Sequence, residues 1–382
     1  MSADSTVEST IAADRPHETT PGTAAAVGYR ARRGDPVRVA IVGATGYVGS
    51  ELIRLLSLHP DVRIVGLVGR ERQGDPIGGI HPHLATRDLL VHDSVPAEAE
   101  AVFLALPHGA VAGRIEEFLG RGQTVIDLGP DFRLRDPADY PRWYHFDHPR
   151  GDLLASAVYG LPELHRAELA DIGTRPGAIV GSPGCYATTT ILALAPLARA
   201  GLIGDLVVDA KSGVSGAGRD PKPDLQFGEV NESVKAYGIF SHRHIGEIEQ
   251  ELGALGGDGT NPGVRGVDFL PHLVPMTRGI LSACHVRPTR AVTQAELDDL
   301  YRDAYGDEPF VSVVDAPPAT KHVLGSNEAR VWSRLDQRNG RILAIGVLDN
   351  LVKGAAGQAI QAFNVVHGLP ETAGLQQLPL GP

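Results

Sequence analysis

The sequence is poor in cysteine, in clustered basic residues and in long apolar runs. Only two of its 382 residues are cysteines, Cys185 and Cys284, and they form no CxxC pair. Neither a disulfide framework nor a thiolate zinc site is indicated, and a reducing compartment fits. The 35 basic residues face 46 acidic ones without any Lys/Arg run, giving a net charge of -11. Nucleic-acid binding depends on clustered positive charge, so we expect a small-molecule partner and no nucleic acid.

No apolar run reaches the ~18 residues of a membrane span, and polar residues follow Met1 where a signal segment would become apolar. We therefore expect a cytoplasmic protein without a membrane partner. Residues 1–36 are rich in Ser, Thr, Ala, Asp and Glu and lack apolar periodicity. Such a composition cannot bury enough surface to offset the entropy of ordering, so it predicts a disordered tail.

From Val37 onward, short β-branched runs alternate with stretches that carry apolar residues at helical spacing. This alternation predicts parallel βαβ units, and therefore an α/β fold with an N-terminal Rossmann-like dinucleotide-binding domain. The predicted strands are Val37–Val42, Ile64–Val68, Val102–Leu106, Thr124–Leu128 and Ala178–Gly181, and the predicted helices include Tyr47–Leu58 and Ala110–Leu119.

The second half has a mixed pattern that predicts an α+β domain, to which the family resemblance given below assigns catalysis and oligomerisation. The boundaries we expect are 37–185 together with 351–382 for the first domain and 186–350 for the second. Thr293 with Glu296 forms a capping sequence at the start of a helix. The other predicted elements are helices Tyr186–Ala200, Gln294–Tyr305 and Gly354–Val366, strands Leu206–Ala210, Phe269–Val274 and Gly279–Val286, and strands near Val311 and Ile342.

A glycine-rich turn follows the first predicted strand directly and opens a helix. In that context, backbone N–H groups and a helix N-terminus can hold the pyrophosphate of a dinucleotide. The alternative is a tight βα turn with close helix packing. The turn comprises Gly43, Ala44, Thr45, Gly46, Tyr47, Val48 and Gly49, and all but Ala44 are predicted cofactor contacts.

Arginine stands where an NAD site usually has an acidic residue. The second strand is followed by Arg70, Glu71 and Arg72. Because a guanidinium suits a 2′-phosphate, Arg70 favours NADPH over NADH. A solvated arginine pair is the alternative. Leu106 and Pro107, at the carboxyl end of another parallel strand, are also predicted to contact the cofactor.

Cys185 follows Ser182-Pro183-Gly184 and begins a predicted helix. The unpaired N–H groups and the positive end of the helix dipole favour a thiolate there, and they can stabilise an oxyanion. A small buried residue is an equally good interpretation of the pattern alone. Cys284 lies within an alternating strand without neighbouring glycines, which predicts a packed core thiol.

With these residues in view, the sequence from about Val37 to the C-terminus resembles the N-acetyl-gamma-glutamyl-phosphate reductases, within the aspartate-semialdehyde dehydrogenase superfamily. The resemblance rests on several segments together. They are GATGYVG at 43–49, DFRL at 131–134, YGLPEL at 159–164, PGCYAT at 183–188, KSGVSGAGR at 211–219, HRH at 242–244 and DNLVKGAAGQA at 349–359.

The resemblance implies that Cys185 attacks an acyl phosphate and forms a thioester, which hydride from NADPH reduces to the aldehyde. It makes His242 the acid/base, with His244 in reserve. Without it, two histidines on opposite sides of an extended segment would be solvated or structural. It also places Ser215, Gly216 and Asn350 near the cofactor, and it suggests a homodimer or homotetramer.

Three further residues are predicted to bind substrate. A guanidinium can meet a carboxylate or phosphate with two parallel hydrogen bonds, which favours Arg133 and Arg243, although ion pairing is the alternative for Arg133. Ser182 stands where the family has Asn, and it offers one hydrogen bond with a shorter reach. Gly246 replaces the family's usual Pro.

The histidine pairs at 81–83 and 145–148 lack the spacing of a recognised metal site, and the chemistry needs no Lewis acid, so we expect surface loops and no metal. Two other functions stay open. One is reduction of a related acyl phosphate, aspartyl or aminoadipyl, since one methylene changes only a pocket that the sequence does not define. The other is a non-catalytic dinucleotide-binding regulator.

Overall fold

The structure is a computed structural model, and it describes residues 34–256, 264 and 266–381. The described residues belong to one compact unit, Ala31–Pro382. The predicted disordered tail lies outside the described residues as far as residue 33.

The first sheet is entirely parallel, and seven strands of the described chain form it in the order β3-β2-β1-β4-β5-β7-β6. The strand order reverses between β1 and β4, and the carboxyl ends of strands at such a point are where open α/β sheets bind ligands. The strands are β1 (Val37–Val42), β2 (Val62–Val68), β3 (Val91–His92), β4 (Ala101–Leu104), β5 (Thr124–Asp127), β6 (Ala157–Tyr159) and β7 (Ile179–Gly181).

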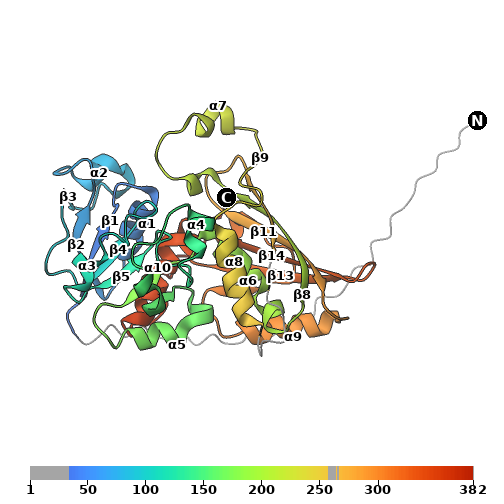
Figure 1. The fold of residues 1–382 in the computed structure, drawn as a ribbon. Coiled ribbons are helices and arrows are strands. Elements are labelled where there is room, and N and C mark those ends of the chain that lie inside the picture. The colour runs from blue at the N-terminus through green and yellow to red at the C-terminus, as the bar shows by residue number, and fades with distance from the viewer. Residues whose placement is uncertain (1–33, 257–263, 265, 382) are drawn as a thin grey trace, which may run out of the picture. The chain divides into compact units, whose positions relative to one another are not determined.

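Helices cover both faces of this sheet because its strands are apolar on both sides. In β1, Val39 and Ile41 share one apolar cluster with α1, α5 and α10, whereas Ala40 and Val42 join the cluster that contains α3. Figure 1 shows the C-terminal helix α10, in red, among the helices of this region. The helices are α1 (Tyr47–Leu56), α2 (Ile77–Ile80), α3 (Ile115–Leu119), α4 (Asp139–Tyr144), α5 (Pro162–Ile172) and α10 (Gly357–Val366).

The second sheet is mixed, in the order β12-β13-β14-β11-β8-β10-β9. Its long central strand β11 runs antiparallel to both β8 and β14. The strands are β8 (Ile203–Ser212), β9 (Lys235–Ala236), β10 (Asp268–Leu273), β11 (Ile280–Pro288), β12 (Val311–Val313), β13 (Ala329–Asp336) and β14 (Arg341–Leu348).

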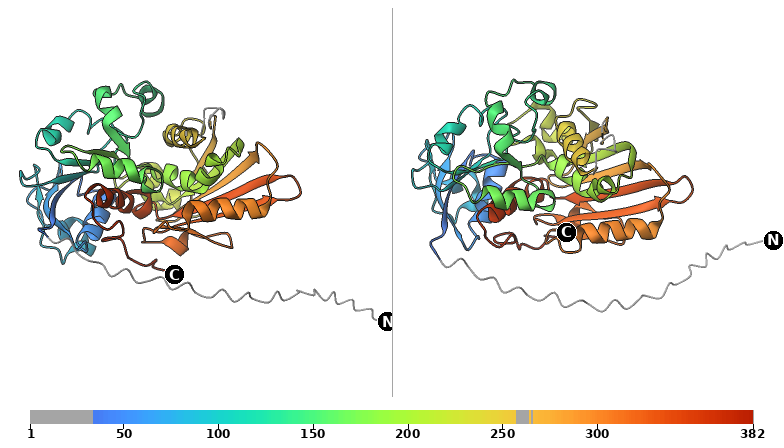
Figure 2. Two further views of the ribbon diagram at one scale, coloured as in Figure 1. Left: turned by 90° about the horizontal axis from the view of Figure 1, so that it is seen from below. Right: turned by 60° about the horizontal axis from the view of Figure 1, so that its bottom comes forward.

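Three helices pack beside this sheet, as Figure 2 shows from two further directions. The helix α6 (Cys185–Arg199) is buried on nearly all sides and contacts α8 (His244–Leu255), β11 and β14, which agrees with a sequence that is apolar or small all round. The third helix is α9 (Gln294–Tyr305). Short turns complete the chain: α7 (Phe227–Val230), the 3-10 turns at 82–84, 151–156, 214–217, 223–225 and 320–323, and a π-helical turn η6 (Val352–Ala356).

The predicted fold class is confirmed: a parallel sheet with helices on both faces precedes a mixed α+β region. The Thr293 hydroxyl accepts the Glu296 N–H at 3.2 Å, so the predicted cap begins α9. The predicted helix from Ala110 is shorter, since only Ile115–Leu119 is helical. The interval 110–114 contains Gly113, which disfavours helix. The expected domain boundaries stay predictions.

No helix among the described residues is long and apolar enough to cross a membrane.

Candidate functional site

The glycine-rich turn brings backbone together more closely than side chains would allow. Gly43 has φ +86°, and a Cβ there would lie 2.2 Å from the Ala105 carbonyl oxygen; a Cβ on Gly49 would lie 2.3 Å from the Gly43 oxygen. A Cβ on Gly46 would meet only the Gly43 oxygen, at 3.5 Å. The first and last glycines therefore serve packing, and the middle one leaves open space at the helix start.

This turn fits a dinucleotide pyrophosphate. Gly46 is the N-cap of α1 and supplies no side-chain acceptor, and the first intrahelical bond runs from Ser50 N–H to the Gly46 carbonyl. The N–H groups of Tyr47, Val48 and Gly49 consequently have no intrahelical acceptor. Together with the helix dipole, these donors suit a phosphate anion.

Arg70 and Arg72 follow β2 and differ in their partners. Arg72, with φ +65°, pairs with Asp75. Arg70 is exposed and makes no ion pair within the described residues. Its guanidinium is therefore free for a 2′-phosphate, although the same geometry suits a solvated arginine.

The segment after β4 is fixed by one buried carboxylate. Asp131 accepts hydrogen bonds from the N–H groups of Gly109, Val111 and Ala112, at 2.8 to 2.9 Å. Leu106 is half-buried and Pro107 exposed just before this anchored turn. Both lie at the switch point of the sheet, as expected for cofactor contacts.

Asn350, Ser215 and Gly216 meet although they are far apart in the sequence. Asn350 donates from Nδ2 to the Ser215 hydroxyl at 3.0 Å, and its Oδ1 accepts the Gly279 N–H at 2.8 Å. Gly216 borders the same amide, because a Cβ there would lie 3.7 Å from Nδ2. Arg219 from this loop donates to the Thr45 carbonyl in the glycine-rich turn at 2.8 Å. The predicted cofactor residues of both halves of the chain are thus linked.

Cys185 is the first residue of α6 and is half-buried. Gly354 of η6 packs against it, since a Cβ there would lie 2.8 Å from the Cys185 Cβ. Burial raises the pKa of the thiol, although Arg133, the Tyr186 N–H and Arg243 act in the opposite direction. The net shift of the thiol pKa is upward, which favours a mechanism in which a base assists the thiol. Cys284 is fully buried, as predicted, and burial raises the pKa of its thiol as well.

Glu247 on α8 is the main residue that the sequence analysis missed. Its fully buried carboxylate accepts from the Gly184 N–H at 2.9 Å, from the Tyr159 and Tyr144 hydroxyls at 2.8 and 3.0 Å, and from Arg133 at 3.1 Å. Buried carboxylates are stable only with such donors. Glu247 thus fixes the backbone immediately before Cys185. An acidic residue three positions after His244, on the same helix face, was the available signal.

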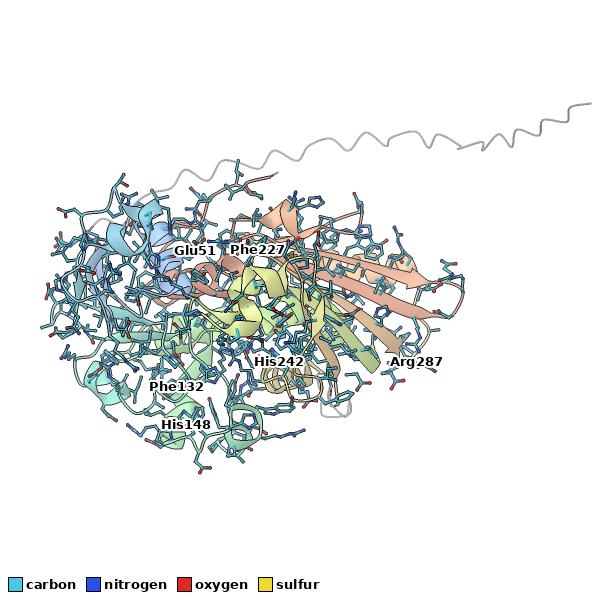
Figure 3. The ribbon with its side chains drawn as sticks, turned by 90° about the horizontal axis from the view of Figure 1, so that it is seen from above. Glu51, Phe132, His148, Phe227, His242 and Arg287 are labelled. Atoms are coloured by element: carbon cyan, nitrogen blue, oxygen red, sulfur yellow. The ribbon has the colours of Figure 1, made fainter. Side chains whose placement is uncertain are left out.

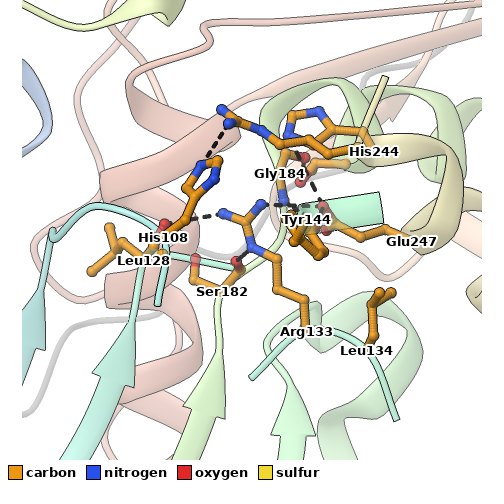
Figure 4. A network of polar contacts seen from close by, with 12 residues as sticks. His108, Leu128, Arg133, Leu134, Tyr144, Ser182, Gly184, His244 and Glu247 are labelled. Atoms are coloured by element: carbon orange, nitrogen blue, oxygen red, sulfur yellow. Dashed lines mark hydrogen bonds and ion pairs between the residues drawn. The ribbon is translucent and has the colours of Figure 1, made fainter. Parts of the chain in front are cut away.

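Arg133 is held on three sides by protein groups, as Figure 4 shows. Besides Glu247, its guanidinium donates to the carbonyl oxygens of Ser182 at 2.7 Å and Leu128 at 3.0 Å. The ion pair considered for Arg133 therefore exists, with Glu247 instead of the neighbouring aspartates. Substrate binding by Arg133 stays a prediction.

His242 and His244 do not lie on an extended segment, which corrects that interpretation. Ile245, Ile248 and Leu252 repeat at helical spacing and are buried, so α8 begins at His244. His242 lies before the helix among the rings of Tyr186, Tyr237 and Phe269, with centroids 5.4 to 5.6 Å away.

The ring of His244 lies against Gly184, the residue before Cys185. Its Nε2 lies 3.9 Å from Oε1 of Glu247, and a Cβ on Gly184 would lie 2.3 Å from the same nitrogen. Its Nδ1 has no hydrogen-bond partner among the described residues. Burial, and then His242 and Arg243, hold the pKa of His244 well below its usual value, so the ring is neutral at pH 7. For His242, burial and Arg243 lower the pKa to about 3.

Arg243, the residue just before α8, reaches the segment after β4, where it donates to Nε2 of His108. Its side chain is exposed, and its positive charge acts on Cys185. Arg243 is therefore close enough to act on the thiol electrostatically, and its exposed guanidinium has further donors for a ligand. The Ser182 side chain is buried, and its Oγ has no partner in the described part of the chain.

Gly246, which stands where the family usually has Pro, is explained by its contact with Trp143. A Cβ there would lie 2.6 Å from the Trp143 ring, so the indole occupies the space that a proline would need.

The two histidine pairs considered for a metal are not simple surface loops. His81 is buried, with Nε2 3.2 Å from the Ala44 carbonyl oxygen. His148 is half-buried, lies beside Phe132 (Figure 3) and bonds the Asp131 carbonyl at 2.7 Å. Within the described residues no group of three or more His, Cys, Asp or Glu side chains could hold a metal ion.

Comparison with known families gives two matches. Residues 38–172 match the semialdehyde dehydrogenase NAD binding domain, and residues 185–350 match the semialdehyde dehydrogenase dimerisation domain.

Two similar proteins carry one name. N-acetyl-gamma-glutamyl-phosphate reductase of Heliobacterium modesticaldum is 46% identical over 357 residues, 91% of this chain and 100% of the relative. The protein of that name from Symbiobacterium thermophilum is 48% identical over 348 residues, 89% of this chain and 97% of the relative.

Solved structures share the fold. Aspartate semialdehyde dehydrogenase II from Vibrio cholerae superposes with a TM-score of 0.66 at 20% identity, over 87% of this chain and 98% of that chain. The aspartate semialdehyde dehydrogenase from Candida albicans, solved with NADP, superposes with a TM-score of 0.60 at 18% identity, over 87% and 98%.

Proposed function

We propose that this chain, which belongs to the N-acetyl-gamma-glutamyl-phosphate reductase family of semialdehyde dehydrogenases, reduces N-acetyl-glutamyl 5-phosphate to N-acetyl-glutamate 5-semialdehyde with release of phosphate. The reaction is a step of arginine biosynthesis. NADPH is the proposed reductant, on the strength of the free Arg70 guanidinium after β2.

One observation carries the proposal. Cys185 begins a helix, a buried carboxylate accepts the N–H of Gly184 just before it, the His244 ring packs against Gly184, and the charge of Arg243 acts on the thiol. These residues supply a nucleophile, a candidate base and a carboxylate, the groups that covalent acyl transfer requires, and this supports the proposal.

In the first half of the reaction, His244 takes the thiol proton of Cys185 as the sulfur attacks the acyl carbon. The carbon–oxygen bond to phosphate breaks, phosphate leaves and a thioester remains on the sulfur. Glu247 stabilises the imidazolium that forms, because its carboxylate lies 3.9 Å from Nε2. Arg243 is placed to neutralise the phosphate or the substrate carboxylate.

In the second half, the Asn350–Ser215 cluster would hold the nicotinamide of NADPH, which would supply the hydride that reduces the thioester carbon. The resulting thiohemiacetal loses its carbon–sulfur bond, and His244 returns the proton to the sulfur as the semialdehyde leaves. The Gly184 N–H is committed to Glu247, so the amides left for the oxyanion are those of the first turn of α6.

From the family pattern we expected His242 to be the acid/base. His244 fits that role better. The Nδ1 of His242 accepts the His244 N–H at 3.2 Å, and three aromatic rings surround it. His244 keeps Nδ1 free of partners in the described chain and has a carboxylate beside Nε2.

Oligomerisation through the second domain, as a homodimer or homotetramer, is part of the proposal, because residues 185–350 match a dimerisation domain. Two free cysteines suit the cytoplasm.

The test is the reverse reaction, phosphate-dependent and NADP-linked oxidation of N-acetylglutamate semialdehyde, followed by NADPH absorbance. Wild type and Cys284→Ala should be active, Cys185→Ala inactive, and His244→Asn slower than His242→Asn. Activity in Cys185→Ala would remove the thioester mechanism.

If neither wild type nor any variant is active in this assay, aspartyl and aminoadipyl phosphates are tested as substrates and compared through kcat/KM. NADPH binding without turnover on any of them, with Cys185 alkylated no faster than a free thiol, would identify a regulator.

A further inference from the structure

Helix α1, which starts in the glycine-rich turn, carries a buried charge. Glu51 is 0% exposed, and its two carboxylate oxygens accept from the two terminal nitrogens of Arg278 at 2.9 and 3.2 Å (Figure 3 labels Glu51 on α1). Arg54 also donates to Glu51, at 2.7 Å. Removing a carboxylate from water is costly, so Glu51 depends on these arginine donors inside the fold.

Arg278 belongs to the short connection between β10 and β11, which supports the Asn350–Ser215 cluster. The carbonyl oxygens of Met276 and Thr277 accept the N–H groups of Val214 and Ser215 at 2.9 and 3.1 Å. On the other side, the Gly279 N–H donates to Asn350 at 2.8 Å. The connection at 276–279 therefore fixes both polar partners of the cluster.

We infer that the Glu51–Arg278 ion pair is a positioning device for the dinucleotide, which sets the distance between the turn at its pyrophosphate and the cluster at its nicotinamide. The inference rests on the proposed cofactor site. Neither side chain takes part in the chemistry. The pair acts through Gly279 and Asn350 at one end and through the axis of α1 at the other.

Arg54 provides a matched control. It donates to the same Glu51 oxygen but lies on the same helix, three residues away, and its other partner is the Gly325 carbonyl. Loss of Arg54 removes a positive charge from Glu51 without untying the 276–279 connection from α1.

The experiment compares Arg278→Met with Arg54→Met by calorimetry, using NADPH and 2′-phospho-ADP-ribose, a fragment that lacks nicotinamide. In Arg278→Met, we expect the preference for NADPH over the fragment to fall about tenfold, because a displacement near 1 Å is enough to lose such contacts. Fragment affinity should stay within about twofold, since the turn itself is intact. Arg54→Met should keep the wild-type preference.

A kinetic readout separates positioning from simple loss of active protein. If hydride transfer slows while acylation does not, water hydrolyses more of the thioester to the free acid and restores the thiol. Phosphate released per NADPH oxidised should then rise above one in Arg278→Met and return toward one in Arg278→Lys. A fall in active protein alone would leave this ratio unchanged.

Equal loss of NADPH and fragment, or the same effect in Arg54→Met, would overturn the inference. If Arg278→Met does not fold, Glu51→Gln/Arg278→Met also removes the buried carboxylate charge that Arg278 helped to neutralise, and it is tested in the same way. The binding comparison uses no acyl phosphate, so its outcome does not depend on whether the proposed substrate is correct.

Discussion

The glycine-rich turn and the pocket around Cys185 prepare for their ligands in opposite ways. The turn at 43–49 works by the absence of side chains: its backbone folds tightly and leaves N–H groups unpaired. The pocket is built by side chains from distant segments. Glu247 and His244 hold and cover Gly184, Gly354 packs against Cys185, and the charge of Arg133 acts on the thiol. The glycine-rich turn is formed by residues adjacent in the sequence. The surroundings of the nucleophile are formed by residues that only the tertiary structure brings together.

The two regions should therefore fail differently. Added atoms should damage the turn, and lost donors or acceptors should damage the pocket.

The largest effect is expected for the nucleophile. Cys185→Ser should lower kcat by at least about 10³-fold, because serine cannot form a thiolate and its hydroxyl is a far weaker nucleophile. NADPH affinity, measured by calorimetry, should stay at the wild-type value. Residual turnover near that of wild type would mean that another group attacks the substrate.

The second-largest effect on kcat is expected for Glu247, whose carboxylate accepts the Gly184 N–H. Glu247→Gln should lower kcat by about 10²-fold to 10³-fold, since it leaves the imidazolium of His244 without its counter-charge. Steady-state kinetics should show this with KM for NADPH unchanged. Glu249→Gln on the same helix is the control, because that carboxylate accepts the Gly266 and Val267 amides instead. Similar losses in both variants would contradict the role of Glu247.

A single methyl group should test how closely the pocket is packed. Gly354→Ala places a Cβ 2.8 Å from the Cys185 Cβ and should reduce kcat/KM by about tenfold to 10²-fold through displacement of the thiol. Gly228→Ala, which has nothing within 4 Å, should behave as wild type. If both variants keep full activity, the contact of η6 with Cys185 has no catalytic consequence.

The same methyl group in the turn should affect only the cofactor. Gly46→Ala has room for its Cβ and an ordinary φ of -84°, so thermal unfolding should be unchanged. The methyl would stand in the phosphate cradle and should raise KM for NADPH about tenfold, on the scale of one or two lost charge-assisted hydrogen bonds. An unaltered KM would show that the turn serves packing alone.

The smallest effect is a level pH profile. Because burial holds the pKa of His244 well below 6.5, its ring stays neutral as pH falls from about 8 past 6.5, and kcat/KM should remain constant over that range. The acid limb should begin only where the lowered pKa is approached. An inflection near pH 6.5 would show that the acting base is solvated. Water would then reach the pocket in spite of the contacts that Glu247 and Arg133 make.

Several elements followed from local sequence. The first strand, Val37–Val42, and the helix predicted from about Gln294 to Tyr305 have the expected bounds, because a β-branched run and a Thr cap act within a few positions. The strand Ala329–Asp336 was missed, since polar and charged residues at alternate positions hide its apolar face.

The candidate site was only partly predictable. Arg133 and Arg243 have the same guanidinium, but one is enclosed by three acceptors and the other is exposed beside the thiol. The order of His242 and His244 in the chain does not say which ring faces Glu247, because that depends on where α8 begins.

By itself, the sequence determined the βαβ alternation, the cradle of glycines after β1 and the cysteine at the start of α6, since backbone conformation and helix ends respond to neighbours along the chain. Only the tertiary structure decided that Glu247 holds the amide before Cys185, that Glu51 meets Arg278, and that Asn350 meets Ser215. Burial and charge pairing depend on which segments the fold brings together, and residues 135 or 227 positions apart carry no local sign of it.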